Sequence, residues 1–117
     1  MPSVLLLDAD RNFRDALAVG LRLDGFLVAV AGAADQAIRW LDAARFDACV
    51  ADARTPGLDG VADAASRTGA QIVLTGPHPD LLALAVRRVA GAAALSKPFG
   101  ASELAARIAP APVPPGG

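Results

Sequence analysis

With 117 residues, of which 54% are hydrophobic and 20% charged, the chain is long enough for one domain with a sizeable core and too apolar for a disordered segment. Eleven basic and twelve acidic residues leave a net charge of −1 with no basic run, which excludes the phosphate neutralisation that nucleic-acid binding requires. No apolar run approaches the length of a membrane span, about 18 residues, and no basic and apolar leader begins the chain. The single cysteine excludes an internal disulfide. We therefore expect a cytoplasmic protein that binds neither nucleic acid nor membrane.

Five short runs rich in valine, isoleucine and leucine predict β-strands. In chain order they cover residues 3–8, 26–31, 46–52, 71–75 and 92–96. Their apolar residues are continuous and do not alternate with polar ones, which is typical of strands buried on both faces of a parallel sheet.

Segments with apolar residues at helical spacing separate these strands and predict helices. The spacing is carried by Phe13, Leu17 and Leu21, by Ala34, Ile38 and Leu41, by Leu82, Ala85 and Val89, and by Leu104 and Ile108, with a further helix near residues 61–67. Asp10, Asp80 and Ser102 stand where helix N-caps are expected. Gly25 and Gly69 stand where left-handed residues follow helices.

The fivefold alternation of strand and helix predicts an α/β domain with a doubly wound parallel sheet and helices on both faces. This alternation covers residues 1–109. Residues 110–117 are rich in proline and glycine and lack the backbone donors for helix or sheet, so we expect a tail or linker. Both a link to a further domain and a natural terminus fit this composition.

Polar residues stand at the ends of four predicted strands. Asp8 ends the first strand with Asp10 beyond it, Asp52 ends the third, Thr75 ends the fourth, and Lys97 follows the fifth. Ligands of doubly wound sheets bind outside this edge. Carboxylates suit Mg²⁺, and an amine with a hydroxyl suits phosphoryl oxygens. The sequence therefore predicts a site for a divalent cation and a phosphoryl group.

Asp8 and Asp52 also bring two like charges together at this edge. Lys97, the only lysine of the chain, is the cation in this set that offsets them. We therefore expect Asp52→Asn to relieve repulsion and to stabilise the fold by about 1 kcal/mol.

Four motifs at these strand ends resemble those of the receiver domains of two-component response regulators. They are VLLLDAD at residues 4–10, DACVADARTPGLDG at 47–60, IVLT at 72–75 and SKPF at 96–99. The resemblance spans residues 3–109 and implies a flavodoxin-like strand order 2-1-3-4-5. It also implies a signalling module, not an enzyme, that receives a phosphoryl group from a sensor histidine kinase or a phosphotransfer protein.

The same resemblance assigns roles at the phosphoryl site. Asp52 matches the phosphoacceptor, whose carboxylate attacks the phosphorus. Thr75 matches the residue that hydrogen-bonds the phosphoryl group, and Lys97 the residue that pairs with it. Pro98 is expected to follow a cis peptide bond.

The metal site departs from the family pattern. Receiver domains usually end the first strand with two adjacent acids, the second of which binds the metal, whereas this chain has Asp8 and Ala9. The remaining ligands that the resemblance implies are Asp8, Asp52 and the backbone carbonyl of Arg54, with Asp10 as a further candidate. We therefore expect a weakened Mg²⁺ site, with the Arg54 side chain as a solvated loop cation beside it.

A second departure concerns the transmission of a signal. Three residues before Lys97, where receiver domains usually carry an aromatic switch residue, the chain has Ala94, which has no rotamers to change. Two interpretations stay open: a phosphorylated receiver domain, and a pseudo-receiver that acts as a protein interaction module not switched by phosphorylation. An output domain beyond residue 117 and a second copy of the chain are further candidate partners. A flavodoxin-like FMN carrier is disfavoured, because the acids of residues 8–12 repel a phosphate.

Overall fold

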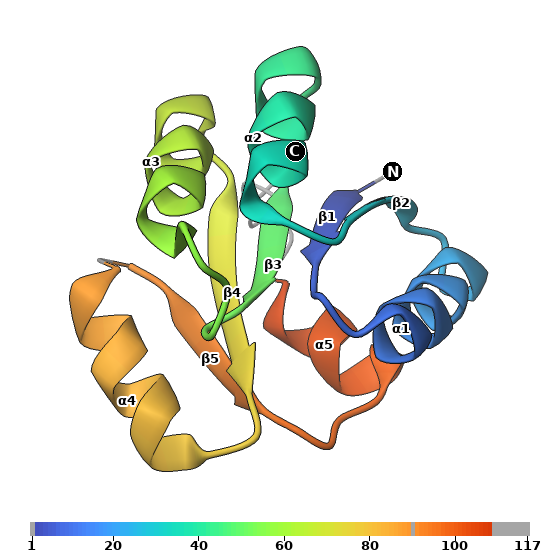
Figure 1. Cartoon of the computed structure of the whole chain (residues 1–117). Coiled ribbons are helices and arrows are strands. Elements are labelled where there is room, and N and C mark those ends of the chain that lie inside the picture. Colours follow the sequence, from blue (N-terminus) through green and yellow to red (C-terminus); the bar gives the residue numbers. More distant parts are fainter. Residues whose placement is uncertain (1, 90, 109–117) are drawn as a thin grey trace, which may run out of the picture.

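In the computed structural model, which describes residues 2–89 and 91–108, five strands alternate with five helices (Figure 1). In chain order they are β1 (Ser3–Leu7), α1 (Arg11–Leu23), β2 (Leu27–Ala31), α2 (Ala34–Ala43), β3 (Ala48–Asp52), α3 (Leu58–Thr68), β4 (Gln71–Gly76), α4 (Pro79–Arg88), β5 (Ala93–Ser96) and α5 (Ala101–Arg107). The expected tail, residues 110–117, lies outside the described residues. Within the described ranges, every helix is too short or too polar to cross a membrane.

The strands form one parallel sheet in the order β2-β1-β3-β4-β5, which confirms the predicted fold class and the order that the resemblance implied. The interior strands β1, β3 and β4 are buried along almost their whole length. Helices cover both faces of the sheet, so neither face of an interior strand meets water. This burial explains why the apolar runs in the sequence are continuous.

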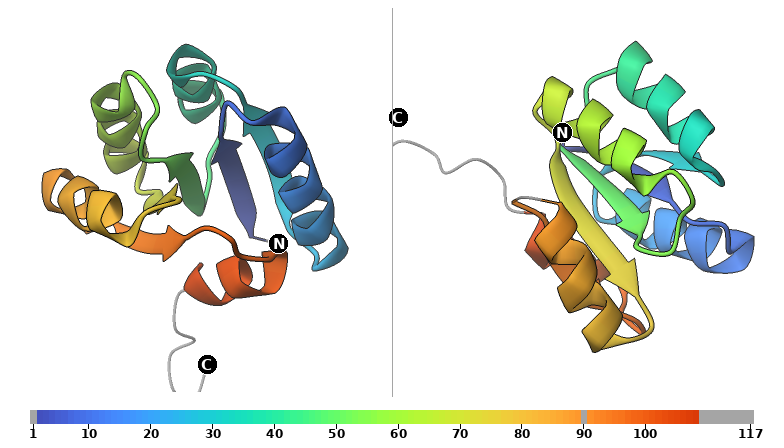
Figure 2. Two further views of the ribbon diagram at one scale, coloured as in Figure 1. Left: turned by 60° about the horizontal axis from the view of Figure 1, so that its bottom comes forward. Right: turned by 60° about the vertical axis from the view of Figure 1, so that its left-hand side comes forward.

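The sheet separates two cores, because successive residues of a strand point to opposite faces. On one face, α2, α3 and α4 cover a cluster that includes Leu5 and Leu74. On the other face, α1 and α5 cover a cluster that includes Leu6 and Val73 (Figure 2). Side chains two residues after Leu6 and Val73 therefore emerge at the sheet edge on the α1 and α5 face.

The helix starts confirm one of the three predicted N-caps. Asp10 caps α1, since its side chain accepts a hydrogen bond from an amide of the first turn. Asp80 lies inside α4, because Pro79 fits the first position of a helix and α4 starts there, with His78 as its N-cap residue. Ser102 lies inside α5, whose N-cap residue is Gly100.

Two glycines lie in left-handed conformations at helix ends, as predicted. Gly25 has a φ of 94° just beyond α1, and Gly69 has a φ of 79° at the end of α3. Residues with a Cβ rarely adopt this conformation, so glycine lets the chain leave each helix and return to the sheet.

Candidate functional site

Asp8, Asp52 and Thr75 lie together at the carboxyl edge of the sheet. Asp8 directly follows β1, Asp52 is the last residue of β3, and the strand register pairs Asp52 with Thr75 on β4. All three residues are buried. Strand alternation places them on the face covered by α1 and α5. The structure thus brings together residues that the sequence places up to 67 positions apart, between Asp8 and Thr75.

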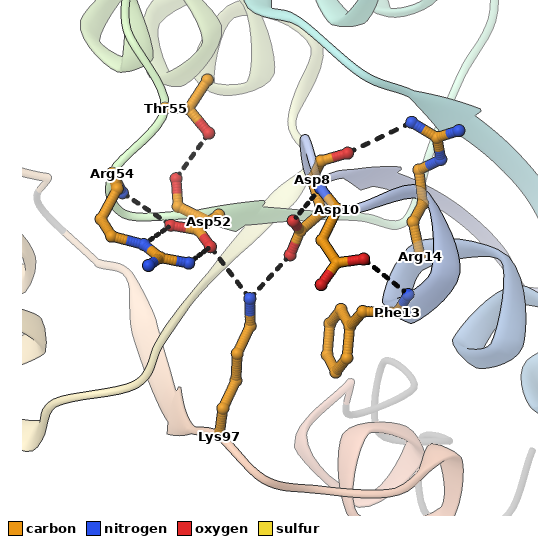
Figure 3. A network of polar contacts seen from close by, with 8 residues as sticks. All are labelled: Asp8, Asp10, Phe13, Arg14, Asp52, Arg54, Thr55 and Lys97. Carbon is orange, nitrogen blue, oxygen red and sulfur yellow. Dashed lines mark hydrogen bonds and ion pairs between the residues drawn. The ribbon is translucent and has the colours of Figure 1, made fainter.

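Lys97 bridges the two carboxylates (Figure 3). Its Nζ donates hydrogen bonds to Oδ2 of Asp8 and to Oδ2 of Asp52, each at 2.9 Å, and lies 4.4 Å from the centre of the Phe13 ring. Burial opposes the charged ammonium, but the hydrogen bonds to the two carboxylates outweigh burial and raise the pKa of Lys97. The peptide bond between Lys97 and Pro98 is cis, as the resemblance implied.

The Arg54 side chain is exposed, as expected of a loop cation, but it is also paired with a carboxylate of the site, which the sequence pattern did not predict. Its guanidinium forms a bidentate ion pair with Asp52, in which Nε donates to Oδ1 at 3.1 Å and Nη2 donates to Oδ2 at 2.8 Å. The Arg54 amide also donates to Oδ1 of Asp52 at 2.8 Å, which closes a tight turn and directs the side chain back over the carboxylate. The Asp-Ala-Arg spacing in a turn is the sequence signal that points to this pair.

The Asp52 carboxylate is held in its ionised form. Burial opposes the charge, but hydrogen bonds from the Arg54 guanidinium, from the Arg54 amide and from Lys97 together outweigh burial and lower the pKa of Asp52 from 3.8 to about 2. The ionised form therefore stabilises the folded chain. This finding reverses the expectation that Asp52→Asn stabilises the fold, because two cations, and not Lys97 alone, offset the charge of Asp52.

We expect Asp52→Asn to lower the free energy of unfolding at pH 7 by on the order of 2 kcal/mol. Because the pKa of Asp52 lies below its ordinary value, the stabilisation is complete above about pH 5 and is lost as the pH falls through 3.8 towards 2. Urea unfolding of wild type and variant at several pH values measures the gap between them. A gap that stays constant from pH 7 to pH 2.5 contradicts this prediction.

The Asp10 side chain accepts a hydrogen bond at the start of α1. Its Oδ1 accepts a hydrogen bond from the Phe13 amide at 3.1 Å, and its own amide donates to Oδ1 of Asp8 at 2.8 Å. Asp10 therefore caps the helix and orients Asp8 through its backbone. The Asp8 oxygens are both engaged, one by this amide and the other by Lys97.

Ala94 and Leu95 lie on opposite sides of β5. Ala94 packs against the core beneath α2, α3 and α4, whereas Leu95 belongs to the core beneath α1 and α5. Leu95 therefore points away from the side of β5 on which Ala94 lies. Thr75 pairs with Leu95 in the strand register, so the site and Leu95 share one face of the sheet.

The strand order and the buried aspartates at the carboxyl edge of the sheet are those of a flavodoxin-like α/β domain. A family model described as the response regulator receiver domain matches residues 4–109. The chain belongs to this family and contains the receiver domain of a two-component response regulator.

Curated relatives support the same assignment. The chain is 38% identical over 117 residues to the transcriptional regulatory protein PrrA of Mycobacterium tuberculosis, with 92% of this chain and 48% of PrrA covered. It is 34% identical over 109 residues to the C4-dicarboxylate transport transcriptional regulatory protein DctD of Rhizobium meliloti, with 88% of this chain and 24% of DctD covered. The chain thus spans from a quarter to about half of the length of these relatives.

Solved structures share the fold. The chemotaxis protein CheY4 of Vibrio cholerae superposes with a TM-score of 0.80 at 22% identity, covering 92% of this chain and 96% of CheY4. A response regulator of Burkholderia pseudomallei, whose structure holds a phosphorylated aspartic acid, a calcium ion and citrate, has a TM-score of 0.80 at 23% identity, covering 93% of this chain and 67% of that one.

Receiver domains generally bind Mg²⁺ at this acidic pocket. The question for this chain is whether its carboxylate oxygens are available as ligands for that ion. A cavity of about 700 Å³ opens beside Asp8, Ala9 and Asp52. All four oxygens of the Asp8 and Asp52 carboxylates already accept hydrogen bonds from lysine, arginine or amide nitrogens. Within residues 2–89 and 91–108, no three His, Cys, Asp or Glu side chains are grouped to hold a metal ion. Mg²⁺ can therefore reach the Asp52 oxygens only by displacing the Arg54 guanidinium, which disfavours the ion at this pocket.

Proposed function

We propose that Asp52 accepts a phosphoryl group from the phosphohistidine of a sensor histidine kinase or a phosphotransfer protein. A carboxylate oxygen of Asp52 attacks the phosphorus, the phosphorus–nitrogen bond breaks, and the imidazole nitrogen keeps the bonding electrons and takes up a proton. Lys97 pairs with the phosphoryl oxygens and Thr75 donates a hydrogen bond to them. The observation that supports this proposal most is the ionised, buried Asp52 beside Lys97 and Thr75, at a cavity open to solvent.

Phosphoramidate as a small phosphodonor tests the acceptor. After incubation with Mg²⁺, intact mass spectrometry is expected to show a gain of one phosphoryl group in the wild type and in Asp59→Asn, and none in Asp52→Asn. Asp59 is a matched control because it lies in the first turn of α3, close along the chain, and is exposed. A mass gain that persists in Asp52→Asn places the phosphoryl group elsewhere and overturns the proposal.

We propose further that Mg²⁺ binding by Asp8, Asp52 and the Arg54 backbone carbonyl is weak, with a dissociation constant in the millimolar range or above. Replacing Ala9 by aspartate is expected to tighten Mg²⁺ binding by about tenfold or more, because Ala9 lines the cavity and affinity for hard cations rises with the number of carboxylates. Isothermal titration calorimetry measures the affinity.

Ala9→Asn is the matched control, since it adds a side chain of the same shape without the charge. It is expected to bind Mg²⁺ as weakly as the wild type. If Ala9→Asp binds no tighter than Ala9→Asn, the missing acid is not what weakens the site.

Ala94 favours a second candidate function, that of a protein interaction module whose surface phosphorylation does not switch. A ligand shifts a conformational equilibrium only through different interactions with the two states, and a methyl group in place of an aromatic ring removes much of that difference. We expect beryllofluoride, a phosphoryl mimic, to change backbone NMR shifts near Asp52 and to leave those of α4 and β5 nearly unchanged. Large changes over residues 80–89 and 93–96 contradict this prediction and favour an ordinary phosphorylation switch.

Two longer relatives support a proposal about the context of this domain. Because PrrA and DctD are longer than the chain and are transcriptional regulators, we propose that the domain works in the cytoplasm as a signalling module and reports to an output domain beyond residue 117. A homodimer is a further proposed partner. Size-exclusion chromatography with light scattering, with and without phosphoramidate, tests the dimer.

A further inference from the structure

The loop after β3 places a second cation on the proposed phosphoacceptor (Figure 3). Lys97 divides its ammonium between Asp8 and Asp52, whereas the Arg54 guanidinium contacts Asp52 alone, through two nitrogens. In the described part of the chain, two carboxylates of the pocket are thus in direct contact with two cations. The charge of the pocket is nearly balanced before any metal ion binds.

The Arg54 guanidinium is suited to exchange the oxygens of the Asp52 carboxylate for those of a phosphoryl group as its hydrogen-bond acceptors. A guanidinium is a planar fork that stays charged, and its parallel donors match two oxygens of either group. The loop itself is held in place, because the Arg54 amide binds Oδ1 of Asp52 and the Thr55 hydroxyl donates to the Asp52 carbonyl oxygen at 2.7 Å. The Arg54 side chain is 57% exposed, so it can move while its backbone stays.

We propose that the Arg54 guanidinium supplies, at the phosphoryl group on Asp52, the positive charge that receiver domains generally take from Mg²⁺, so that phosphoryl transfer to this chain proceeds without a divalent cation. This inference rests on the proposed function of Asp52. A carboxylate oxygen of Asp52 forms a bond to phosphorus as the phosphorus–nitrogen bond of the donor breaks, and the leaving nitrogen keeps the electrons and is protonated. The Arg54 donors pass from the carboxylate to the phosphoryl oxygens.

Two features of the chain complement each other in this proposal. The phosphoryl group on Asp52 carries about 1.5 to 2 negative charges in place of the single carboxylate charge, and Lys97 alone cannot offset them because it also pairs with Asp8. Alanine stands at position 9, where an acid would raise the affinity for a metal ion. Arg54 places a permanent positive charge beside the Asp52 carboxylate. The Arg54 guanidinium thus supplies positive charge at a site where Mg²⁺ binding is disfavoured.

The rate of phosphorylation by phosphoramidate tests the proposal, followed by intact mass on the full chain in Mg²⁺ and in EDTA. The wild type is expected to react at about the same rate in both. Arg54→Ala is expected to react at least about tenfold more slowly in EDTA, and Arg54→Lys to recover only part of the rate because it lacks the fork. Arg11→Ala, which removes an exposed arginine paired with Asp15, is the matched control and is expected to react as the wild type does.

Calorimetry with Mg²⁺ gives a second readout that does not depend on phosphoryl transfer. Arg54→Ala is expected to bind Mg²⁺ more tightly than the wild type, since the Asp52 oxygens lose a competing cation, and Arg11→Ala is expected to bind it as the wild type does. The double variant Ala9→Asp with Arg54→Ala is expected to bind Mg²⁺ tightest and to depend on it for phosphorylation. Circular dichroism verifies that each variant is folded.

The outcomes separate this inference from the function on which it rests. If the wild type gains mass at Asp52 only with Mg²⁺, and Arg54→Ala reacts as fast as the wild type, the role of Arg54 is overturned and the function of Asp52 stands. If no variant gains a phosphoryl group in Mg²⁺ or in EDTA, the function of Asp52 fails and the role of Arg54 fails with it.

Discussion

Replacing Lys97 by methionine is expected to lower the free energy of unfolding by about 3 kcal/mol and Tm by roughly 10 °C or more. Lys97 is the only side chain that contacts both pocket carboxylates among the described residues, and both carboxylates are buried. Without it, Asp8 loses its cation and faces Asp52 with no charge between them. Urea unfolding at pH 7, followed by circular dichroism, measures the loss.

A double-mutant cycle shows whether this loss comes from the unpaired charge. Removing the Asp8 charge as well, in Asp8→Asn with Lys97→Met, is expected to recover a large part of the stability lost in Lys97→Met. Equal instability of the single and double variants contradicts the electrostatic explanation and assigns the loss to packing against Phe13.

Replacing Gly20 by alanine is expected to destabilise the fold by about 1 to 3 kcal/mol, although alanine favours helix over glycine by roughly 1 kcal/mol. Gly20 lies inside α1, where a Cβ atom would come within 2.7 Å of the Ala101 Cβ at the start of α5. Real Cβ atoms do not approach that closely, so the two helices must separate. Thermal and urea unfolding measure the effect.

Exchanging the two residues tests this explanation. The double variant Gly20→Ala with Ala101→Gly restores the space for one methyl group and is expected to be more stable than Gly20→Ala alone. If Gly20→Ala is more stable than the wild type, the higher helix propensity of alanine outweighs the steric clash with Ala101.

Local pattern was sufficient to predict much of the fold. Continuous apolar runs that alternate with segments of helical spacing indicate buried parallel strands and covering helices, because a strand buried on both faces has no alternation of apolar and polar residues.

Helix starts were less predictable, as Asp80 and Ser102 show. Several residues near a helix start can occupy the N-cap position, and the conformation of the backbone that enters the helix determines which one does.

The sequence by itself determined that Asp8, Asp52, Thr75 and Lys97 meet at one edge, because parallel strands bring their carboxyl ends together and a period of two places the side chains on one face. Only the tertiary structure decided how the charges pair. A long arginine side chain has many rotamers of similar energy. The buried carboxylate within its reach favours one of them, so the exposed Arg54 side chain pairs with Asp52 and does not extend freely into solvent. The proposed acceptor therefore has a cation of its own, which the Asp-Ala-Arg spacing permits but does not by itself determine.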